Sequence, residues 1–377
     1  MNFDFPKVDL HFHLDGSISA EFSWKMVKEK GIKVEAKNFE EFKKSVEVDE
    51  NCKSLYDFLK CFDIPVEIMQ DEKSLEECTY EVINLAAKEG IVYLEIRFAP
   101  QLHKKKGLDE EKIVKAVLKG MERGMKNNSS IKVSLILCAM VLGKASLNHE
   151  DNMKTIRVAK KFLGKGVVAV DLAGAEGVTP MENFRDLFEE ANKLNIPFTI
   201  HAGESMGPEN IKMAISFGAK RIGHGVTSIK SEKVMKEIKD KNITLEMCIT
   251  SNVKCNVVPS LKEHPIKKLY DYGIKVTQAN GTELVKLTLE LAAEYVGEAE
   301  KSVDDRDLFT ARINKARAFI AHLISSLNMQ YEISSQLLNI YLYLNSELLK
   351  AGIKGDATLL PRFRGILSSL SEAFGEI

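Results

Sequence analysis

The chain has 377 residues, of which 45% are hydrophobic and 28% are charged, and its formal net charge is −1. This near-neutral balance argues against a protein built mainly to hold nucleic acid or an anionic membrane, and we expect neither as a partner. The composition is typical of a soluble globular protein. The length exceeds one typical domain and allows a large barrel with a smaller additional module.

The cysteines and the N-terminal residues bear on the cellular compartment. The six cysteines include no C-x-x-C pair, which favours reduced thiols over disulfides. The first six residues contain neither a basic region nor an apolar core, and no stretch approaches ~18 uninterrupted apolar residues. We therefore predict no signal peptide and no membrane span, and we expect a cytoplasmic protein.

Short, β-branched apolar runs alternate with helical patterns between residues 7 and 280. These runs are too short for buried helices and too continuous for a half-exposed antiparallel sheet. Their alternation with helices predicts an α/β fold with a (β/α)8 barrel of the TIM type, and a doubly wound open sheet is the main alternative. A long insert at about residues 17–90 is expected to form helices over one mouth of the barrel. The predicted strands lie at 8–11, 92–98, 133–140, 167–172, 198–201, 221–224, 244–248 and 275–277.

Beyond about residue 280 the strand-like runs stop, and four amphipathic helical stretches follow. Their spacing predicts an all-α, antiparallel four-helix bundle. Pro361 is compatible with the last helix only near its start. We therefore divide the chain into a barrel, residues 1–278, and a bundle, residues 279–377. Apolar stripes are formed in the second stretch by Phe309, Ile313, Ala316, Ile320, Leu323 and Leu327, and in the third by Ile333, Leu337, Ile340, Leu344 and Leu348.

Four of the eight histidines stand at the ends of predicted strands, where such a barrel builds its active site. His11 and His13 are two residues apart on an extended strand, so both imidazoles can reach one metal ion. His201 ends another run, and glycines that allow close approach of the backbone to a ligand flank His224. Each histidine alone could be an ordinary core residue. Together they predict a metal site.

The residue types suit a zinc hydrolase. Zinc binds neutral imidazole nitrogens, and a catalytic site leaves one position open for water. The pKa of that water falls from about 15.7 to about 7. A buried carboxyl group that stays protonated can then donate to the substrate, and Glu204, three residues after His201, is placed for this role. Taken alone, Glu204 could be a surface loop residue.

Three sequence blocks closely resemble the signature motifs of adenosine deaminase and its bacterial relatives, in the order and spacing of that family over about residues 1–275. They are His11-Phe-His13-Leu-Asp15-Gly16-Ser17, His201-Ala-Gly-Glu204 and Arg221-Ile-Gly-His224-Gly225. Supporting stretches lie at residues 54–62, 95–100, 170–174 and 248–252.

The resemblance implies one Zn2+ per chain, held by His11, His13 and His201. It implies that Glu204 protonates the purine ring nitrogen beside the carbon under attack. His224 would orient or deprotonate the zinc-bound water. The implied reaction is the addition of hydroxide at carbon 6 of the purine and the loss of ammonia, which converts adenosine to inosine.

The resemblance also assigns a substrate pocket. Asp15 would bind the ribose hydroxyl, and the backbone of Gly174 would meet the purine edge. Phe58, Leu59 and Phe62 would form an apolar lid over the sugar. The chain departs from the family pattern at Ile249, where proline is usual, and at Ala175, where an acid is frequent.

A larger departure follows the last predicted strand. The family carries a Thr-Asp-Asp type motif there, whose first acid binds zinc and whose second binds the purine. In this chain, Gly281 and Thr282 occupy the two acidic positions. The loss predicts impaired turnover, since positioned acid/base groups contribute about 10²–10⁴-fold each. Asn280 or Glu283 is a candidate substitute.

The segment at about residues 276–377 resembles the flagellar secretion chaperone that binds flagellin. The resemblance rests on the runs at 277–284, 327–334 and 341–349, and it implies flagellin as a partner. Three hypotheses follow: a zinc-dependent purine nucleoside deaminase with an impaired site, a catalytically inert barrel that carries a flagellin-binding bundle, and a deaminase of adenine or modified adenosines.

Overall fold

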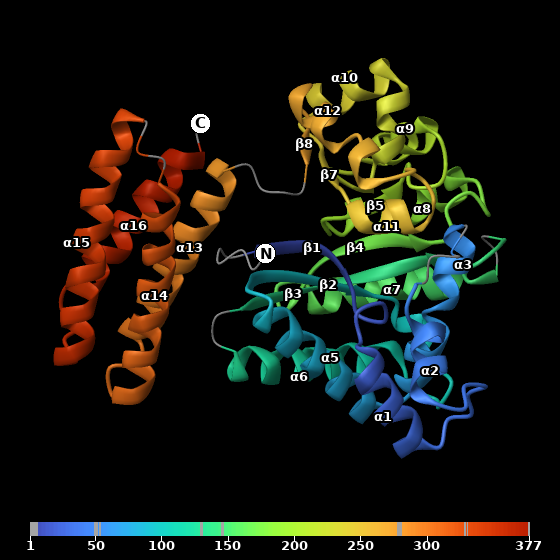
Figure 1. Cartoon of the computed structure of the whole chain (residues 1–377), viewed down its shortest axis with the longest axis horizontal. Helices are drawn as coiled ribbons and strands as arrows, with labels where there is room; N and C mark the ends of the chain where they lie inside the picture. The colour runs from blue at the N-terminus through green and yellow to red at the C-terminus, as the bar shows by residue number, and fades with distance from the viewer. Residues whose placement is uncertain are drawn as a thin grey trace. The chain divides into compact units, whose positions relative to one another are not determined.

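The structure is a computed structural model that describes residues 7–48, 52, 54–128, 131–144, 147–276, 281–327, 329 and 331–375. The chain divides into two compact units, one spanning Lys7–Thr277 and one formed by the segment from Gln278 onward. Figure 1 shows strands surrounded by helices in the first unit and long helices in the second.

The first unit is an α/β fold whose described strands pair in parallel, which confirms that part of the prediction. They form two sheets in chain order, and a parallel bridge from Val170 to Phe198 links the two sheets. A doubly wound sheet would reverse the strand order at a switch point, so the unbroken order fits a TIM-type barrel better. The strands are β1 (Lys7–His13), β2 (Ile91–Phe98), β3 (Lys132–Val141), β4 (Val167–Gly174), β5 (Thr199–Ala202), β6 (Arg221–His224), β7 (Thr244–Glu246) and β8 (Lys275–Val276).

Helices alternate with these strands, and side-chain caps mark where several begin. Asp71, Asp109 and Ser231 each accept a hydrogen bond from a backbone N–H of the first turn, which satisfies a donor that lacks a helical partner. The predicted helical insert is present as the first five helices. The helices of this unit are α1 (Ala20–Lys30), α2 (Phe39–Val46), α3 (Leu55–Lys60), α4 (Asp63–Ile68), α5 (Glu72–Lys88), α6 (Glu110–Asn127), α7 (His149–Phe162), α8 (Arg185–Lys193), α9 (Pro208–Phe217), α10 (Glu232–Asp240), α11 (Ile249–Lys254) and α12 (Ile266–Asp271).

The core lies between the strands and these helices. Leu94, Leu135 and Leu245 are fully buried strand residues, and their removal from water is the main stabilising term. Helices α5 and α6 approach closely because Gly120 has no side chain: a Cβ there would stand 2.5 Å from the carbonyl oxygen of Glu76. The fold therefore depends on small residues at this helix contact as well as on apolar ones.

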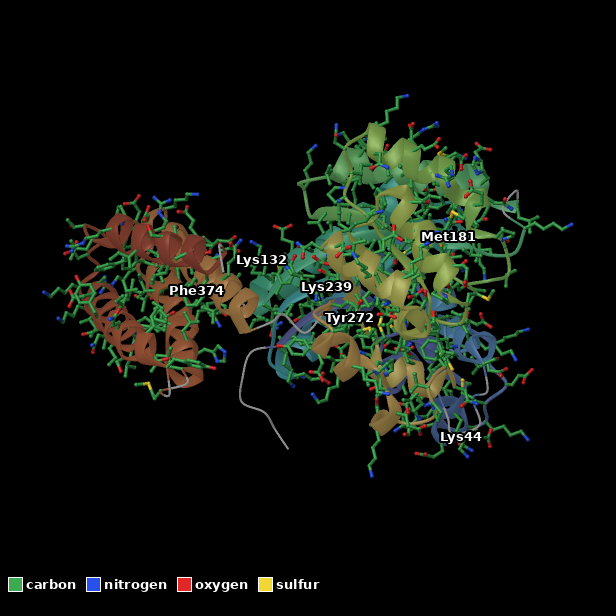
Figure 2. All side chains as sticks on the ribbon, turned by 90° about the horizontal axis from the view of Figure 1, so that it is seen from above. Lys44, Lys132, Met181, Lys239, Tyr272 and Phe374 are labelled. Carbon is green, nitrogen blue, oxygen red and sulfur yellow. The ribbon has the colours of Figure 1, made fainter. Side chains whose placement is uncertain are left out.

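Surface contacts also join neighbouring helices. The Nζ atom of Lys239 at the end of α10 donates to the carbonyl oxygen of Tyr272 just after α12, at 2.9 Å, and stands 5.3 Å from the centre of the Tyr272 ring. Figure 2 labels this pair. Such exposed contacts contribute little to stability, but they mark where the helices following β6 and β7 meet.

The second unit consists, in its described part, of α13 (Gly281–Glu300), α14 (Arg306–Ser326), α15 (Glu332–Lys354) and α16 (Leu360–Gly375). Helix α13 packs on α14 and α16, and α14 packs on α15. The predicted stripe on α14 is buried from Phe309 to Leu323. Pro361 lies at the second position of α16. The prediction for Ile333 was wrong: its side chain is 58% exposed in the first turn of α15, whereas Ser334 beside it is buried, so Ile333 faces solvent.

Two sequence-based expectations concern the environment of the protein. Within the described ranges, no helix is both long and apolar enough to cross a membrane. The six cysteines all lie in the described ranges and form no disulfide, and Cys78, Cys138 and Cys255 are buried. Cys248, the last residue of the predicted strand at 244–248, is only half-buried, because it lines the cavity described below.

Candidate active site

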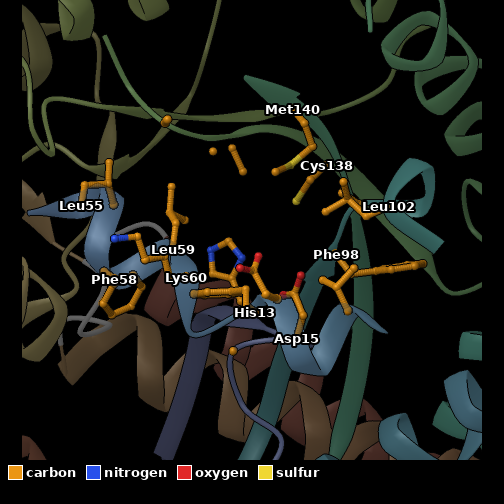
Figure 3. A pocket seen from close by; sticks show the side chains of 18 of the residues that line it. His13, Asp15, Leu55, Phe58, Leu59, Lys60, Phe98, Leu102, Cys138 and Met140 are labelled. Atoms are coloured by element: carbon orange, nitrogen blue, oxygen red, sulfur yellow. The ribbon is translucent and has the colours of Figure 1, made fainter. Parts of the chain in front are cut away.

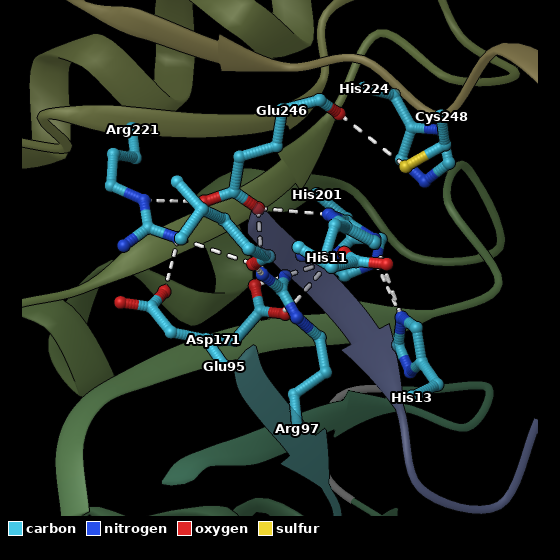
Figure 4. Close-up of polar contacts among 12 residues, drawn as sticks. His11, His13, Glu95, Arg97, Asp171, His201, Arg221, His224, Glu246 and Cys248 are labelled. Carbon is cyan, nitrogen blue, oxygen red and sulfur yellow. Dashed lines mark hydrogen bonds and ion pairs between the residues drawn. The ribbon is translucent and has the colours of Figure 1, made fainter. Parts of the chain in front are cut away.

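Four imidazoles meet at the ends of β1, β5 and β6 (Figure 4). The Nε2 atom of His13 lies 3.4 Å from Nε2 of His11 and 3.3 Å from Nε2 of His201. The ring of His224 stands 4.9 Å from that of His11 between centroids. One ligand atom from each of His11, His13 and His201 lies within 4.8 Å of the others. These three nitrogens are therefore close enough to one another to bind a single metal ion.

The strand geometry explains this convergence. Residues at i and i+2 of a strand point to the same face, so His11 and His13 share one face of β1. Gly223 on β6 leaves the necessary room, since a Cβ there would stand 3.0 Å from Cε1 of His11 and 3.2 Å from Cα of His201. An alanine at residue 223 would press on two of the imidazoles.

The remote nitrogens of two of the rings contact carboxylates. Nδ1 of His11 lies 2.8 Å from Oε2 of Glu246, and Nδ1 of His201 lies 2.9 Å from Oδ2 of Asp171. A carboxylate behind an imidazole fixes the ring orientation and increases the basicity of the nitrogen that faces the metal. Burial lowers the pKa of His11. Burial also opposes protonation of His201, but Asp171 outweighs it and raises the pKa of that residue.

The carboxylates that contact the imidazoles belong to a largely buried network of charged side chains. Arg97 is fully buried and contacts Asp171 at 2.8 Å and Glu246 at 2.7 Å. Arg221 contacts Glu246 and Glu95, both at 2.6 Å. Two guanidinium groups thus face three carboxylates, which leaves one negative charge in excess. A buried negative charge next to these imidazoles favours the binding of a cation.

Glu204 supplies a buried acid beside the imidazoles. Its Oε1 lies 3.5 Å from Nε2 of His224, and the side chain is almost fully buried. Burial raises the pKa of Glu204 to about 7. Near neutral pH, a substantial fraction of this carboxyl group is therefore protonated and able to donate.

The loop that carries Glu204 is held by another carboxylate. Oxygens of Glu176, in the loop after β4, accept hydrogen bonds from Asn210 Nδ2 and from four consecutive backbone N–H groups, at 2.7–3.0 Å. Five donors on one carboxylate hold this loop in a single conformation. The donating backbone groups belong to residues Gly203, Glu204, Ser205 and Met206.

A cavity of about 960 Å³ opens over these groups (Figure 3). Asp15 at its wall is buried, its Oδ1 has no hydrogen-bond partner among the described residues, and burial raises its pKa to about 6. The ring of Phe62 stands 6.2 Å from that of His13 and 5.7 Å from that of Phe58. The cavity thus combines an apolar wall with a polar atom that a ligand can satisfy.

Comparison with known proteins agrees with this geometry. The family model described as "Adenosine deaminase" matches residues 6–330. The adenosine deaminase of Haemophilus ducreyi is 41% identical over 273 residues, which cover 72% of this chain and 78% of that protein.

The chain belongs to the adenosine deaminase family.

Solved structures of related deaminases are similar over most of the chain. The adenine deaminase of Arthrobacter aurescens aligns with a TM-score of 0.65 and 21% identity, over 92% of this chain and 99% of that one. The N6-methyl-AMP deaminase of Arabidopsis thaliana aligns with a TM-score of 0.62 and 25% identity, over 91% and 98%. Membership in the family makes the chain an aminohydrolase enzyme.

The structure of this adenosine deaminase family member brings the predicted site residues into one cavity. Its lining contains all ten of them: His11, His13, Asp15, Phe58, Leu59, Phe62, Gly174, His201, Glu204 and His224. Gly174 has a φ of 106°, and a Cβ there would stand 2.7 Å from the carbonyl oxygen of Val141, so only glycine fits. The individual roles of these residues stay predictions.

The residues behind the imidazoles were not predicted from the sequence. Arg97, Asp171 and Glu246 form the buried charge network, and Glu176 holds the loop of Glu204. The sequence did contain a signal for them. A charged residue inside a predicted buried strand needs a partner of opposite charge. Cys248 was missed too: its Sγ lies close to the nitrogens of His11 and His224. The thiol donates to the carbonyl oxygen of Glu246 at 3.4 Å, which leaves the three histidines as the better ligand set.

The region of the predicted Thr-Asp-Asp replacement is only partly described. Asn280 lies outside the described residues, and Gly281 and Thr282 begin α13 with side chains that are not described. The proposed substitutes Asn280 and Glu283 are therefore not assessed by the structure.

Proposed function

We propose that the chain catalyses the zinc-dependent hydrolytic deamination of a purine nucleoside, converting adenosine to inosine and ammonia. The observation that carries the proposal is the convergence of three imidazole nitrogens beside a buried, partly protonated carboxyl group. Three neutral nitrogen ligands with one open position are a common catalytic zinc set, so the residues present fit the metal. A bound zinc ion supplies Lewis acidity, which makes a water molecule nucleophilic at neutral pH.

The side chains of the cavity divide the remaining tasks. Glu204 donates its proton to the ring nitrogen beside the carbon under attack, which offsets the negative charge that develops there. His224, 3.5 Å from Glu204, orients the attacking water. The free Oδ1 of Asp15 accepts from a ribose hydroxyl, and Phe58 and Phe62 cover the sugar and exclude solvent.

A direct assay tests the proposal. The full-length protein, loaded with zinc, is incubated with adenosine, and the ultraviolet absorbance change on conversion to inosine is followed. We expect turnover that disappears after chelation and returns with zinc. His13→Ala removes one ligand and should abolish the activity, whereas the surface variant His149→Ala should leave it intact. No turnover in a sample shown by elemental analysis to contain zinc would reject the proposal.

The substrate class rests on the same cavity. We infer that a nucleoside is preferred over a free base, because Asp15 and the lid residues have no role with adenine alone. A panel of adenosine, adenine and N6-modified adenosines decides this point. A higher kcat/KM for adenine than for adenosine would favour the alternative of an adenine deaminase.

We also infer that turnover is lower than in relatives that carry both acids of the last-strand motif. The doubly substituted variant Gly281→Asp, Thr282→Asp restores those residue types. If the missing acids limit the reaction, kcat should rise by about 10²-fold. An unchanged or lower kcat in a folded variant would show that this chain has no such deficit to repair.

A second function, binding of flagellin, is proposed for the helical unit. It is supported by the sequence resemblance of its helices to a flagellar chaperone and by the mutual packing of α13–α16. Retention of a flagellin C-terminal peptide by the full-length chain tests the proposal, and failure of the peptide to bind at micromolar concentration would remove it.

A further inference from the structure

A row of hydrogen bonds runs behind His224, away from the cavity. Nδ1 of His224 lies 2.9 Å from Nδ2 of Asn252, and Oδ1 of Asn252 lies 3.2 Å from Nε2 of His264. Nδ1 of His264 in turn accepts a hydrogen bond from the backbone N–H of Ile266 at 3.2 Å. All three side chains are buried. Asn252 belongs to α11, and His264 lies shortly before α12; neither lines the cavity.

The direction of every bond in this row follows from its outer end. A backbone N–H can only donate, so Nδ1 of His264 must accept. Burial lowers the pKa of His264, and the neutral ring then carries its hydrogen on Nε2. That Nε2–H donates to Oδ1 of Asn252, which turns the NH2 group of Asn252 toward His224. Nδ1 of His224 is therefore an acceptor.

The hydrogen bond between Asn252 and His224 determines which nitrogen of the His224 ring carries the hydrogen. Because Nδ1 of His224 accepts from the NH2 group of Asn252, it carries no hydrogen, and the ring is neutral. With Nδ1 accepting, its single hydrogen lies on Nε2, the nitrogen that faces Glu204 at 3.5 Å. A ring in this state donates a hydrogen bond into the cavity and has no free lone pair there.

We propose that Asn252 and His264 are positioning residues that hold His224 with its hydrogen on Nε2, so that His224 orients the attacking water by donation. This inference rests on the proposed function for its kinetic meaning, but the tautomer itself does not. It decides between the two roles, orientation and deprotonation, that the family resemblance left open for His224.

The backbone of His224 shows why such support matters. Its φ is 62°, in the left-handed region that residues other than glycine rarely adopt, and this conformation is strained. The N–H of the next residue, Gly225, donates to the carbonyl oxygen of Ala202 at 3.0 Å. The backbone thus aims the ring into the cavity, and Asn252 sets which nitrogen carries the hydrogen.

A test of Asn252 has to distinguish its proposed role in setting the tautomer of His224 from a purely structural role in the loop. Its backbone carbonyl also accepts from the N–H groups of Val257 and Val258, so loss of the side chain could disturb the loop. A directional test avoids this ambiguity. Asn252→Asp keeps the shape of the side chain but presents only acceptors to His224, which should draw a hydrogen onto Nδ1.

The first measurement is the nitrogen-15 NMR spectrum of the histidines in the zinc-loaded, full-length protein, with His224 assigned by comparison with His224→Gln. We expect the Nε2–H tautomer of His224 in the unsubstituted protein. In Asn252→Asp we expect the Nδ1–H form or a doubly protonated ring. A hydrogen on Nδ1 in the unsubstituted protein, or an unchanged tautomer in Asn252→Asp, would overturn the inference.

The second measurement is steady-state kinetics. Asn252→Asp should lower kcat by about 10–100-fold with little change in KM, as is usual for residues that orient an active-site imidazole from behind. His264→Gln retains an N–H donor for Asn252 and should keep more activity than His264→Ala. Equal activities of the two variants would contradict a positioning role for His264. Asn192→Asp, whose amide donates to the carbonyl oxygen of Phe217, is the matched control. If the unsubstituted protein does not turn over adenosine but shows the expected tautomer, only the proposed function fails.

Discussion

Glu204 is a carboxyl group whose usefulness depends on its surroundings. An ordinary glutamate has a pKa of 4.5, and burial raises the pKa of this residue to about 7. An exposed glutamate in the same sequence context would be ionised at neutral pH and unable to donate a proton. The same residue type therefore has opposite chemistry in a loop and in this cavity.

The raised pKa predicts how activity depends on pH. Donation requires protonated Glu204, which predominates below about pH 7 in the ligand-free protein, so kcat/KM should fall as the pH rises through that value. Glu204→Gln should lower kcat by about 10²–10⁴-fold. The remaining activity of the variant should no longer fall as the pH rises through about 7. The profile is measured on zinc-loaded protein between pH 5 and 9. A plateau that continues without change above pH 8 would contradict the assignment of Glu204 as the acid.

Asp171 contacts His201, one of the three imidazoles of the candidate metal site. Because its carboxylate contacts Nδ1 of His201 at 2.9 Å, Asp171→Asn should weaken zinc binding by about 10–100-fold. Zinc content after dialysis against chelators of graded strength measures the effect. Asp240→Asn, on the surface of α10, is the control. Equal zinc retention by the two variants would show that His201 does not need this partner.

At the scale of elements, the site depends on contacts between the segments that follow neighbouring strands. The loop after β4 supplies Glu176, and the segment between β5 and α9 supplies the backbone donors that surround it. This arrangement ties the position of Glu204 to a carboxylate 28 residues earlier in the chain. A shift of about 1 Å in a catalytic group can cost about 10²-fold in rate.

Glu176→Gln should therefore lower kcat/KM by about 10²-fold, because the amide presents an NH2 group to donors and cannot bind all five. Hydrogen exchange of the amides of residues 203–206 should become faster in the same variant. Glu182→Gln, in an exposed pair with Arg185, provides the comparison. Unchanged exchange together with unchanged kinetics would mean that the loop holds its conformation without this carboxylate.

At the scale of the whole molecule, each of the two units buries apolar residues of its own in the part of the chain that the structure describes. The buried cluster that surrounds the active site draws only on residues of Lys7–Thr277. The helices beyond it bury their own apolar residues, among them Ile313 and Leu344. Two cores of this kind can unfold independently.

Independent unfolding gives a prediction for the full-length chain. Ile313→Ala should destabilise the helical unit by about 2–5 kcal/mol and shift one thermal transition, while zinc removal should shift the other. Differential scanning calorimetry with and without a chelator measures both. A single transition that moves in response to either change would show that the two units unfold as one.

Local sequence patterns predicted the four histidines and Glu204, and the family resemblance supplied the other predicted residues that line the cavity. His11 and His13 follow the two-residue period of a strand, and strand ends in a parallel α/β fold meet at one edge. The signature blocks added the expected roles of Glu204, Asp15 and the lid residues. The apolar spacing of α14 likewise predicted its buried face. In the first turn of α15 the prediction failed, because the adjacent Ser334 is buried and Ile333 faces solvent.

Only the tertiary structure decided which residues support those that face the cavity. Arg97 and Glu246 are 149 residues apart in the chain, and Asn252 and His264 lie outside the strands. No local period relates these partners, since hydrogen bonds and charge pairs form wherever folding brings groups together. The sequence by itself determined the types of the chemical groups and their directions along each strand. Their protonation states and tautomers depend on burial and on distant neighbours, which exist only in the folded chain.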